Sequence, residues 1–198
     1  MKDETNIRDE SHIAIIGNCP DFVDAGQMPD RCDWVTRFNN TAGFMDVSGT
    51  AISELVLVSR GGQATEWLAD PEFTNRPAMR KAALITLVFP PSSDPGDECG
   101  ALELTSLLEG IGKRVRYIEQ SVHDQARQEL EALGAPPDAA LSSGFVYAFE
   151  TLLDRPEDAP PVIVAGFSFE GWDGHAWGAE KRWFGDMQQS GRLDIRGL

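Results

Sequence analysis

Short apolar runs recur along the chain, and turn-forming residues follow most of them. The runs stand at residues 13–16, 34–38, 55–58, 83–89, 115–118 and 162–165. Most are continuously apolar rather than alternating, which is typical of strands that are covered on both faces. Glycine, asparagine or proline marks the end of most runs. The pattern predicts buried strands at these positions.

Longer stretches with helical character lie between the apolar runs. We expect helices over residues 99–112, 122–133, 143–153 and 175–189. Alternating strands and helices predict an α/β fold with a doubly wound, mostly parallel sheet of the Rossmann-like type. We expect it to form one domain over residues 12–198. Residues 1–11 are charged and lack aromatic side chains, so they are predicted to be a flexible N-terminal tail.

The composition fits one globular domain and narrows the range of partners. The chain has 198 residues, of which 41% are hydrophobic, and its formal net charge is −15. Such a charge argues against a nucleic-acid backbone or an anionic membrane as partner. No stretch approaches the ~18 apolar residues of a membrane span, and the polar residues 1–5 do not resemble a secretory signal. We therefore expect a cytoplasmic protein with no transmembrane segment.

Neither the cysteines nor the acidic residues indicate a metal site. Cys19, Cys32 and Cys99 lack the CxxC spacing of zinc ligands, and we expect them to be reduced thiols. No pair of aspartates beside a strand end has the spacing that holds Mg²⁺ between phosphates. The chain is expected to work without a metal or another cofactor.

The ends of the predicted strands are the first place to look for a ligand site. In an open parallel sheet, ligands bind outside the carboxyl ends of the strands. Gly17 at the first end permits close backbone approach, and the amides of Asn18 and Asn39 can donate to phosphate or ribose oxygens. No dinucleotide fingerprint and no P-loop is present. An ordinary strand-to-helix turn is the other interpretation of residues 17–20.

Two serines and a glycine stand before the predicted helix that begins near residue 143. Ser142, Ser143 and Gly144 would leave backbone N–H groups pointing at an anion. A serine in this position also caps a helix without binding any ligand. Both interpretations stay open at this point.

His175 is the candidate for acid–base chemistry. It follows the last predicted strand in a loop that contains Gly171, Asp173 and Gly174, and binding residues concentrate in such loops. A histidine titrates near neutrality and suits general-base catalysis. Glu180 lies five residues further on and is placed to brace the loop. The competing interpretation is a surface histidine without a role.

In this order, the fragments resemble motifs of the eukaryotic-type sialyltransferase family, which includes bacterial relatives. The first motif is an apolar strand that ends in Gly-Asn and is followed by a D-x-V-x-R-x-N segment. The second is a helix that starts with serine and glycine and is followed by a strand that ends in Gly-Phe. The third is a histidine followed by a glutamate. The matching stretches are residues 13–18, 33–39, 141–144, 166–167 and 175–180. The resemblance implies a Rossmann-like enzyme that transfers a sialic-acid-type or Kdo-type sugar from its CMP donor to an acceptor hydroxyl.

The resemblance also implies roles for individual residues. The implied nucleotide-binding residues are Gly17, Asn18, Asn39, Ser142, Ser143 and Gly144. His175 would deprotonate the acceptor in an inverting, metal-independent displacement, with Arg37 and Glu180 in supporting roles. The expected partners are a CMP-sugar and a glycan or small-molecule acceptor, and the oligomeric state is left open.

The chain departs from the family pattern at several points, which keeps alternatives open. Leu141 replaces the usual proline, and no second histidine is recognisable between Gly166 and His175. One alternative is therefore a catalytically inactive, sialyltransferase-like nucleotide-binding or accessory protein. The other is an unrelated Rossmann-type enzyme, although the glycine fingerprint of that class is missing.

Overall fold

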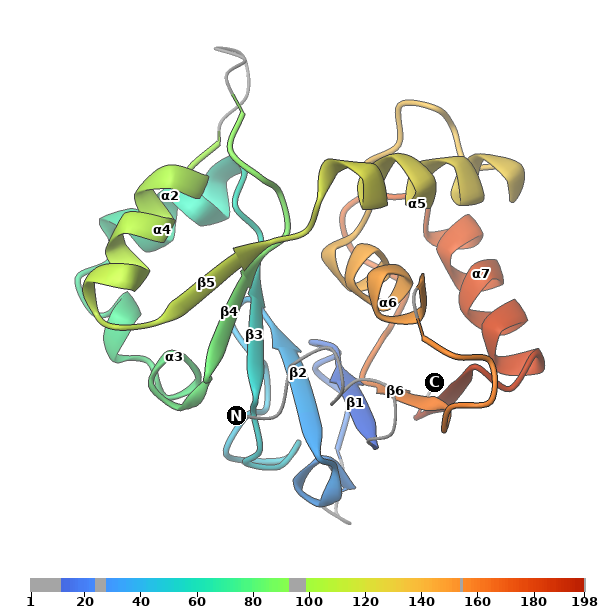
Figure 1. Ribbon diagram of the computed structural model, residues 1–198, viewed down its shortest axis with the longest axis horizontal. Coiled ribbons are helices and arrows are strands. Elements are labelled where there is room, and N and C mark those ends of the chain that lie inside the picture. The colour runs from blue at the N-terminus through green and yellow to red at the C-terminus, as the bar shows by residue number, and fades with distance from the viewer. Residues whose placement is uncertain (1–11, 24–27, 93–98, 154, 198) are drawn as a thin grey trace.

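The computed structural model describes residues 12–23, 28–92, 99–153 and 155–197. These residues form one domain around a seven-stranded sheet with the strand order β5-β4-β3-β2-β1-β6-β7 (Figure 1). All neighbouring strands are parallel. The predicted doubly wound, Rossmann-like α/β fold is therefore confirmed. The predicted tail, residues 1–11, lies outside the described residues.

The six strands expected from the apolar runs all form. The strands are β1 (Ile13–Ile16), β2 (Trp34–Phe38), β3 (Glu54–Leu57), β4 (Leu84–Leu87), β5 (Arg114–Tyr117), β6 (Val162–Ala165) and β7 (Leu193–Arg196). The apolar pattern does not predict β7, in which apolar and charged residues alternate. That pattern suits its place at the edge of the sheet, where it pairs with β6 alone.

Helices cover both faces of the sheet, with α2, α3 and α4 on one side of Figure 1 and α5, α6 and α7 on the other. The helices are α2 (Gly61–Ala69), α3 (Pro77–Lys81), α4 (Ala101–Gly110), α5 (Gln120–Ala132), α6 (Ser143–Leu153) and α7 (Trp177–Gln189), with short 3-10 turns η1 (Met28–Arg31) and η2 (Phe73–Asn75).

Two predictions about the helices need correction. Helices α2 and α3 were not expected, and α7 begins at Trp177, so His175 precedes the helix instead of belonging to it. None of the helices described is long and apolar enough to cross a membrane.

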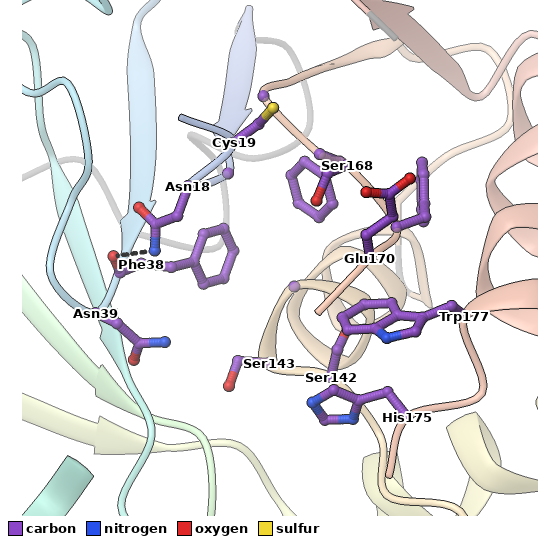
Figure 2. Close-up of a pocket in the computed structure, with 15 residues that line it drawn as sticks. Asn18, Cys19, Phe38, Asn39, Ser142, Ser143, Ser168, Glu170, His175 and Trp177 are labelled. Carbon is purple, nitrogen blue, oxygen red and sulfur yellow. Dashed lines mark hydrogen bonds between the residues drawn. The ribbon is translucent and has the colours of Figure 1, made fainter. Parts of the chain in front are cut away.

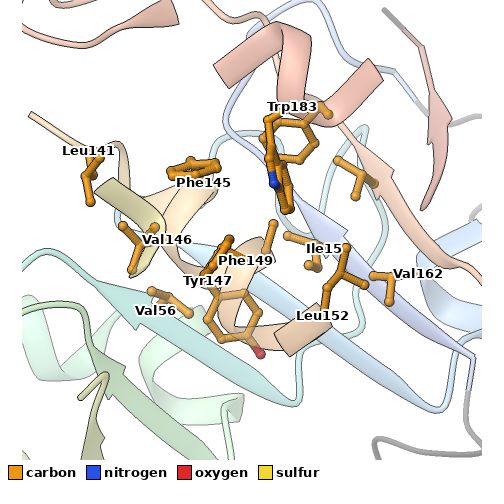
Figure 3. Close-up of a cluster of buried hydrophobic side chains, with 14 of the residues drawn as sticks. Ile15, Val56, Leu141, Phe145, Val146, Tyr147, Phe149, Leu152, Val162 and Trp183 are labelled. Atoms are coloured by element: carbon orange, nitrogen blue, oxygen red, sulfur yellow. The ribbon is translucent and has the colours of Figure 1, made fainter. Parts of the chain in front are cut away.

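Helix α6 lies in the centre of the larger core (Figure 3). Its residues are apolar almost all round, as in a helix that neighbours enclose on every side. Phe145 meets the ring of Trp183 from α7 edge-on, with the ring centroids 5.1 Å apart. Val56 of β3 belongs to this core, whereas Leu55 and Leu57 belong to the core on the opposite face of the sheet. Successive residues of β3 thus belong to two different apolar cores, one on each face of the sheet.

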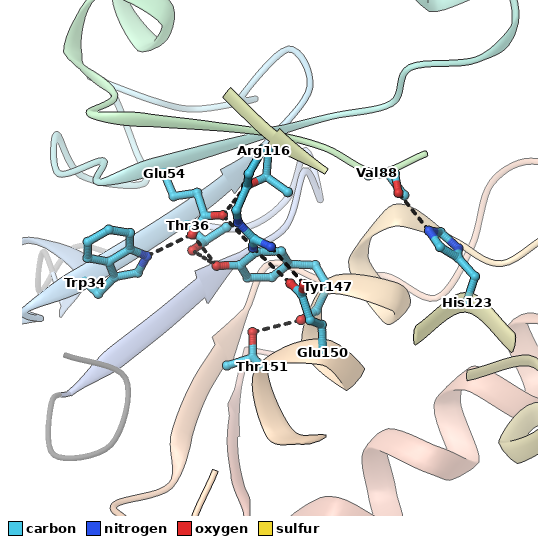
Figure 4. Close-up of polar contacts among 10 residues, drawn as sticks. Trp34, Thr36, Glu54, Val88, Arg116, His123, Tyr147, Glu150 and Thr151 are labelled. Atoms are coloured by element: carbon cyan, nitrogen blue, oxygen red, sulfur yellow. Dashed lines mark hydrogen bonds and ion pairs between the residues drawn. The ribbon is translucent and has the colours of Figure 1, made fainter. Parts of the chain in front are cut away.

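A buried carboxylate joins α6 to the sheet (Figure 4). Glu54 of β3 is fully buried, and it accepts hydrogen bonds from Arg116 of β5 at 3.0 Å and from the Tyr147 hydroxyl of α6 at 2.6 Å. Arg116 also donates to both carboxylate oxygens of Glu150 on α6, at 2.8 and 2.9 Å. Burial by itself would lower the pKa of the Arg116 guanidinium, but the Glu150 hydrogen bonds and the charges of Glu54 and Glu150 raise it. These contacts hold α6 over β3 and β5.

Replacing Arg116 with methionine should destabilise the fold by about 3 kcal/mol, because the buried Glu54 carboxylate then loses its countercharge. The free energy of unfolding in urea measures the loss. Arg80→Met is the control for the loss of one positive charge, since Arg80 lies exposed on α3 and its loss should matter little. Equal stabilities of the two variants would contradict the role given to Glu54.

Candidate functional site

A cavity of about 270 Å³ lies at the carboxyl ends of β1, β2 and β6 (Figure 2). Here the strand order reverses direction, because β1 pairs with β2 on one side and with β6 on the other, and ligands of doubly wound folds bind at such points. We call this cavity the crevice. It is lined by Gly17, Asn18, Cys19, Phe38, Asn39, Ser142, Ser143, Gly144, Gly166, Phe167, Ser168, Phe169, Glu170, His175 and Trp177. The predicted nucleotide-binding residues and His175 are thus brought together.

Two glycines shape the wall of the crevice by close contact with the end of β6. A Cβ atom at position 17 would lie 2.2 Å from the carbonyl oxygen of Gly166. A Cβ atom at position 144 would lie 2.6 Å from the Phe167 ring. No larger residue fits at either position without a shift of its neighbours. Gly17 and Gly144 therefore let the ends of β1 and β6 and the start of α6 meet closely.

Asn18 joins two loops at the edge of the crevice. Its Nδ2 donates to the carbonyl of Phe38 at 3.0 Å, and its Oδ1 accepts the N–H of Ala42 at 3.0 Å (Figure 2). Both ends of the side-chain amide are thus engaged by the backbone. In this geometry Asn18 holds the chain after β1 against the chain after β2, and it presents little to a ligand.

Asn39 has a different geometry. Its backbone is left-handed, with φ of 49°, a conformation that asparagine adopts more readily than most residues. Its Oδ1 accepts the N–H of Val58 at 2.9 Å. Its Nδ2 makes no hydrogen bond to the described residues, and the side chain lies at the wall of the crevice (Figure 2). Asn39 thus offers a donor whose position the Val58 contact holds.

The first turn of α6 is held by a carboxylate from α7. Ser142 is buried, and its Oγ accepts the N–H of Phe145 at 3.1 Å as a helix cap. Its backbone N–H and its Oγ both donate to Glu180, at 3.0 and 2.6 Å. Ser142 is therefore occupied by its cap and by Glu180. Ser143 and Gly144 follow in the first turn, where N–H groups have no intrahelical acceptor, and Ser143 Oγ has no partner in the described part of the chain.

Glu180 acts on α6 rather than on the histidine ring. It is almost fully buried, and burial raises the pKa of its carboxyl above the ordinary value, while the hydrogen bonds from Ser142 and the charge of His175 act in the opposite direction. No hydrogen bond joins Glu180 to His175 in the described structure.

His175 lies where the loop before α7 meets the chain before α6. Its Nδ1 is 2.9 Å from the carbonyl oxygen of Ala140. A carbonyl only accepts, so Nδ1 carries the hydrogen, and the neutral ring has an acceptor at Nε2. The rings of Trp172 and Trp177 meet the imidazole edge-on, with centroid distances of 5.0 and 4.8 Å. The ring is therefore held in a defined orientation at the crevice.

Arg37 lies away from the crevice. It is buried in β2 and donates to the Ser48 hydroxyl and to the carbonyl of Ala51, both at 2.9 Å. Burial lowers the pKa of its guanidinium to about 10. Arg37 holds the loop between β2 and β3 and makes no contribution to the crevice wall.

Several lining residues were given no predicted role. Phe167 and Ser168 follow β6, so the same strand-end rule points to them, and Cys19 directly follows Asn18. Glu170 lies in the loop before α7 and Trp177 is the first residue of that helix, and nothing in the sequence pattern marks either as a lining residue. No cluster of histidine, cysteine and acidic side chains among the described residues could hold a metal ion. Metal independence stays a prediction.

No model of a known protein family matches the chain. The chain is similar to the urease operon 23 kDa accessory protein of Rhizobium meliloti (strain 1021), with 24% identity over 197 residues. The similarity covers 91% of this chain and 90% of the relative.

This similarity contradicts the sialyltransferase interpretation. A relative named as a urease accessory protein supports neither a CMP-sugar glycosyltransferase nor its inactive form, and the partners inferred from that activity, a CMP-sugar and an acceptor, are wrong as well. The physical reason lies in the motifs themselves. Gly17 is required by its contact with Gly166, Asn18 by the loops that it joins, and Ser142 by its helix cap. Fold requirements thus account for these three residues, which resembled family motifs.

Glu180→Gln should stabilise the protein at neutral pH, because glutamine has no charge to bury and can bond to both Ser142 groups. Glu180 has a raised pKa in the folded state, so the folded protein binds this proton more tightly than the unfolded chain. Wild-type stability therefore falls as the pH rises from the ordinary value of 4.5 towards the raised pKa. The gain in the free energy of unfolding from Glu180→Gln should grow as the pH rises through this range and should then level off.

Urea unfolding of the wild type and the variant over a pH series measures this gain. Glu131→Gln, at an exposed position on α5, controls for the change in net charge. A gain for Glu180→Gln that stays constant or shrinks as the pH rises would contradict the burial argument.

Proposed function

We propose that the crevice binds a small ligand carrying a phosphate or similar oxyanion, and that the protein serves as an accessory protein of a urease. The observation that carries the first part is the convergence of donors on one cavity. Asn39 Nδ2, Ser143 Oγ and the backbone N–H groups of Ser143 and Gly144 belong to residues that line the crevice, and none of these groups has a partner within the described chain.

Neutral donors suit an anion in a protein of this charge. Among the described residues, no lysine or arginine lines the crevice, and Glu170 is the acidic residue of its lining. Backbone N–H groups and the dipole of α6 create a local positive potential in an acidic protein without any basic side chain. His175 lines the same cavity, and its orientation by Ala140 leaves Nε2 as an acceptor for a hydroxyl group of the ligand.

The accessory role rests on the similarity over nearly the whole length of the relative. We propose the cytoplasm as the place of this role. The three thiols, Cys19, Cys32 and Cys99, are unpaired, which is the state that a reducing compartment maintains.

Asn39→Asp should weaken phosphate binding by at least about tenfold, because it replaces the Nδ2 donor with a charged acceptor. Aspartate keeps the Oδ1 contact with Val58 and tolerates the left-handed backbone. Isothermal titration with inorganic phosphate at constant ionic strength measures the affinity.

Asn40→Asp is the matched control, since it makes the same charge change one residue further along. Asn40 accepts hydrogen bonds from Trp67 and Arg76 through its Oδ1, which aspartate retains. Its phosphate affinity should stay within about threefold of the wild type. Equal affinities of all three proteins, or a wild type that binds no phosphate, would refute the proposed site.

The same two variants test the accessory role. In Rhizobium meliloti without its own 23 kDa accessory gene, the chain should restore urease activity relative to the deletion strain. Asn40→Asp should restore it equally and Asn39→Asp less well, at equal protein levels. A wild-type chain that accumulates without raising urease activity would contradict the accessory role and leave ligand binding to be judged by titration.

A further inference from the structure

A second, larger cavity adjoins the crevice on the side of β3 and β4. Its volume is about 830 Å³, and we call it the large chamber. Asn39, Ser143 and His175 line both cavities. A ligand whose anionic group lies in the crevice can therefore extend directly into the large chamber.

Planar groups form one wall of the large chamber. The rings of Phe89 and His123 are stacked, with centroids 5.1 Å apart and planes inclined by 24°. The guanidinium of Arg60 lies over the Phe89 ring, 4.7 Å from its centroid. His123 Nε2 is 2.7 Å from the carbonyl oxygen of Val88, and burial lowers the pKa of the imidazole. His123 thus contributes a neutral flat surface, and Arg60 contributes a flat cation.

Trp172 lines the same chamber with 65% of its surface exposed. A Cβ atom at position 174 would lie 2.3 Å from its ring, so glycine at this position allows the indole to pack on the backbone. The carbonyl of Trp172 accepts the N–H of His175 at 3.2 Å and the Nε1–H of Trp177 at 3.1 Å. The structure thus holds a large aromatic ring in place at a cavity while leaving most of its surface uncovered.

The two cavities differ in the chemistry that they offer. The crevice presents N–H and hydroxyl donors, whereas the large chamber presents aromatic faces and a guanidinium, which stack on planar organic groups. We propose that the ligand is an aryl-type anion, with its oxyanion in the crevice and its planar ring system in the large chamber. This inference rests on the proposed function and specifies the class of ligand that the site selects.

Titration with two phosphate monoesters tests the inference. Methyl phosphate reports on the crevice alone, and 1-naphthyl phosphate adds a ring system with the same anionic group. The naphthyl ester should bind at least about tenfold more tightly than the methyl ester. Trp172→Ala should reduce this ratio at least about threefold, because it should weaken binding of the naphthyl ester much more than binding of methyl phosphate.

A second variant places a bulky side chain at the wall of the large chamber without touching the Trp172 loop. Gly62, in the first turn of α2, lines the chamber, and a Cβ atom there would meet nothing within 4 Å. Gly62→Leu should therefore fold and should abolish the preference for the naphthyl ester. Gly110→Leu is the matched control, because Gly110 is also helical and also has open space around a Cβ. It should keep the preference.

The outcomes of these titrations distinguish the large-chamber inference from the proposed function on which it rests. Binding of both esters with equal affinity would overturn the large-chamber inference and leave the proposed function standing. A naphthyl preference that survives both Trp172→Ala and Gly62→Leu would place the ring elsewhere and would also overturn the inference. If neither ester binds, the proposed function fails together with it.

Discussion

The position of α6 depends on the buried carboxylate of Glu54. A charge without solvent must keep its hydrogen-bond partners, and two of these lie on different elements, Arg116 on β5 and Tyr147 on α6. Arg116 in turn holds Glu150, one helical turn beyond Tyr147. α6 therefore has one favourable position on the sheet, and that position puts its first turn at the carboxyl edge. The crevice exists because the buried contacts of Glu54 hold α6 in a position that places the N-terminus of this helix at the edge of the crevice.

Close backbone contacts complete the crevice. The carbonyl of Gly166 faces Gly17, and the Phe167 ring faces Gly144, at distances that only glycine permits. Asn18 and Glu180 hold the surrounding loops and the helix start. The remaining donors, on Asn39 and Ser143, lie where the crevice and the large chamber meet. The site thus divides into groups that build the walls and a smaller number that are left to contact a ligand.

Sequence patterns predicted the layers of the fold better than the roles of single residues. Continuous apolar runs indicate buried strands because both faces of a parallel sheet are covered, whereas the alternating β7 at the edge gives no such signal. Gly61 and Gly62, which follow the apolar run at 55–58, open α2, and the apolar pattern gives no indication of this helix. The strand-end rule brought Gly17, Asn18 and Asn39 to one cavity. It does not reveal that Asn18 is engaged by backbone groups, because those partners are distant in sequence. Trp172 and Arg60 carried no local pattern, and the family assignment failed because the same residues serve the fold.

The central claim is that the first turn of α6 and Asn39 receive an oxyanion. An NMR titration of the labelled protein with inorganic phosphate tests it most directly, since backbone and side-chain N–H signals report on each donor separately. The account predicts saturable shifts of the Ser143 and Gly144 backbone amides and of the Asn39 side-chain amide, all with one dissociation constant. Unchanged signals from these three groups, with shifts confined to other parts of the molecule, would contradict it.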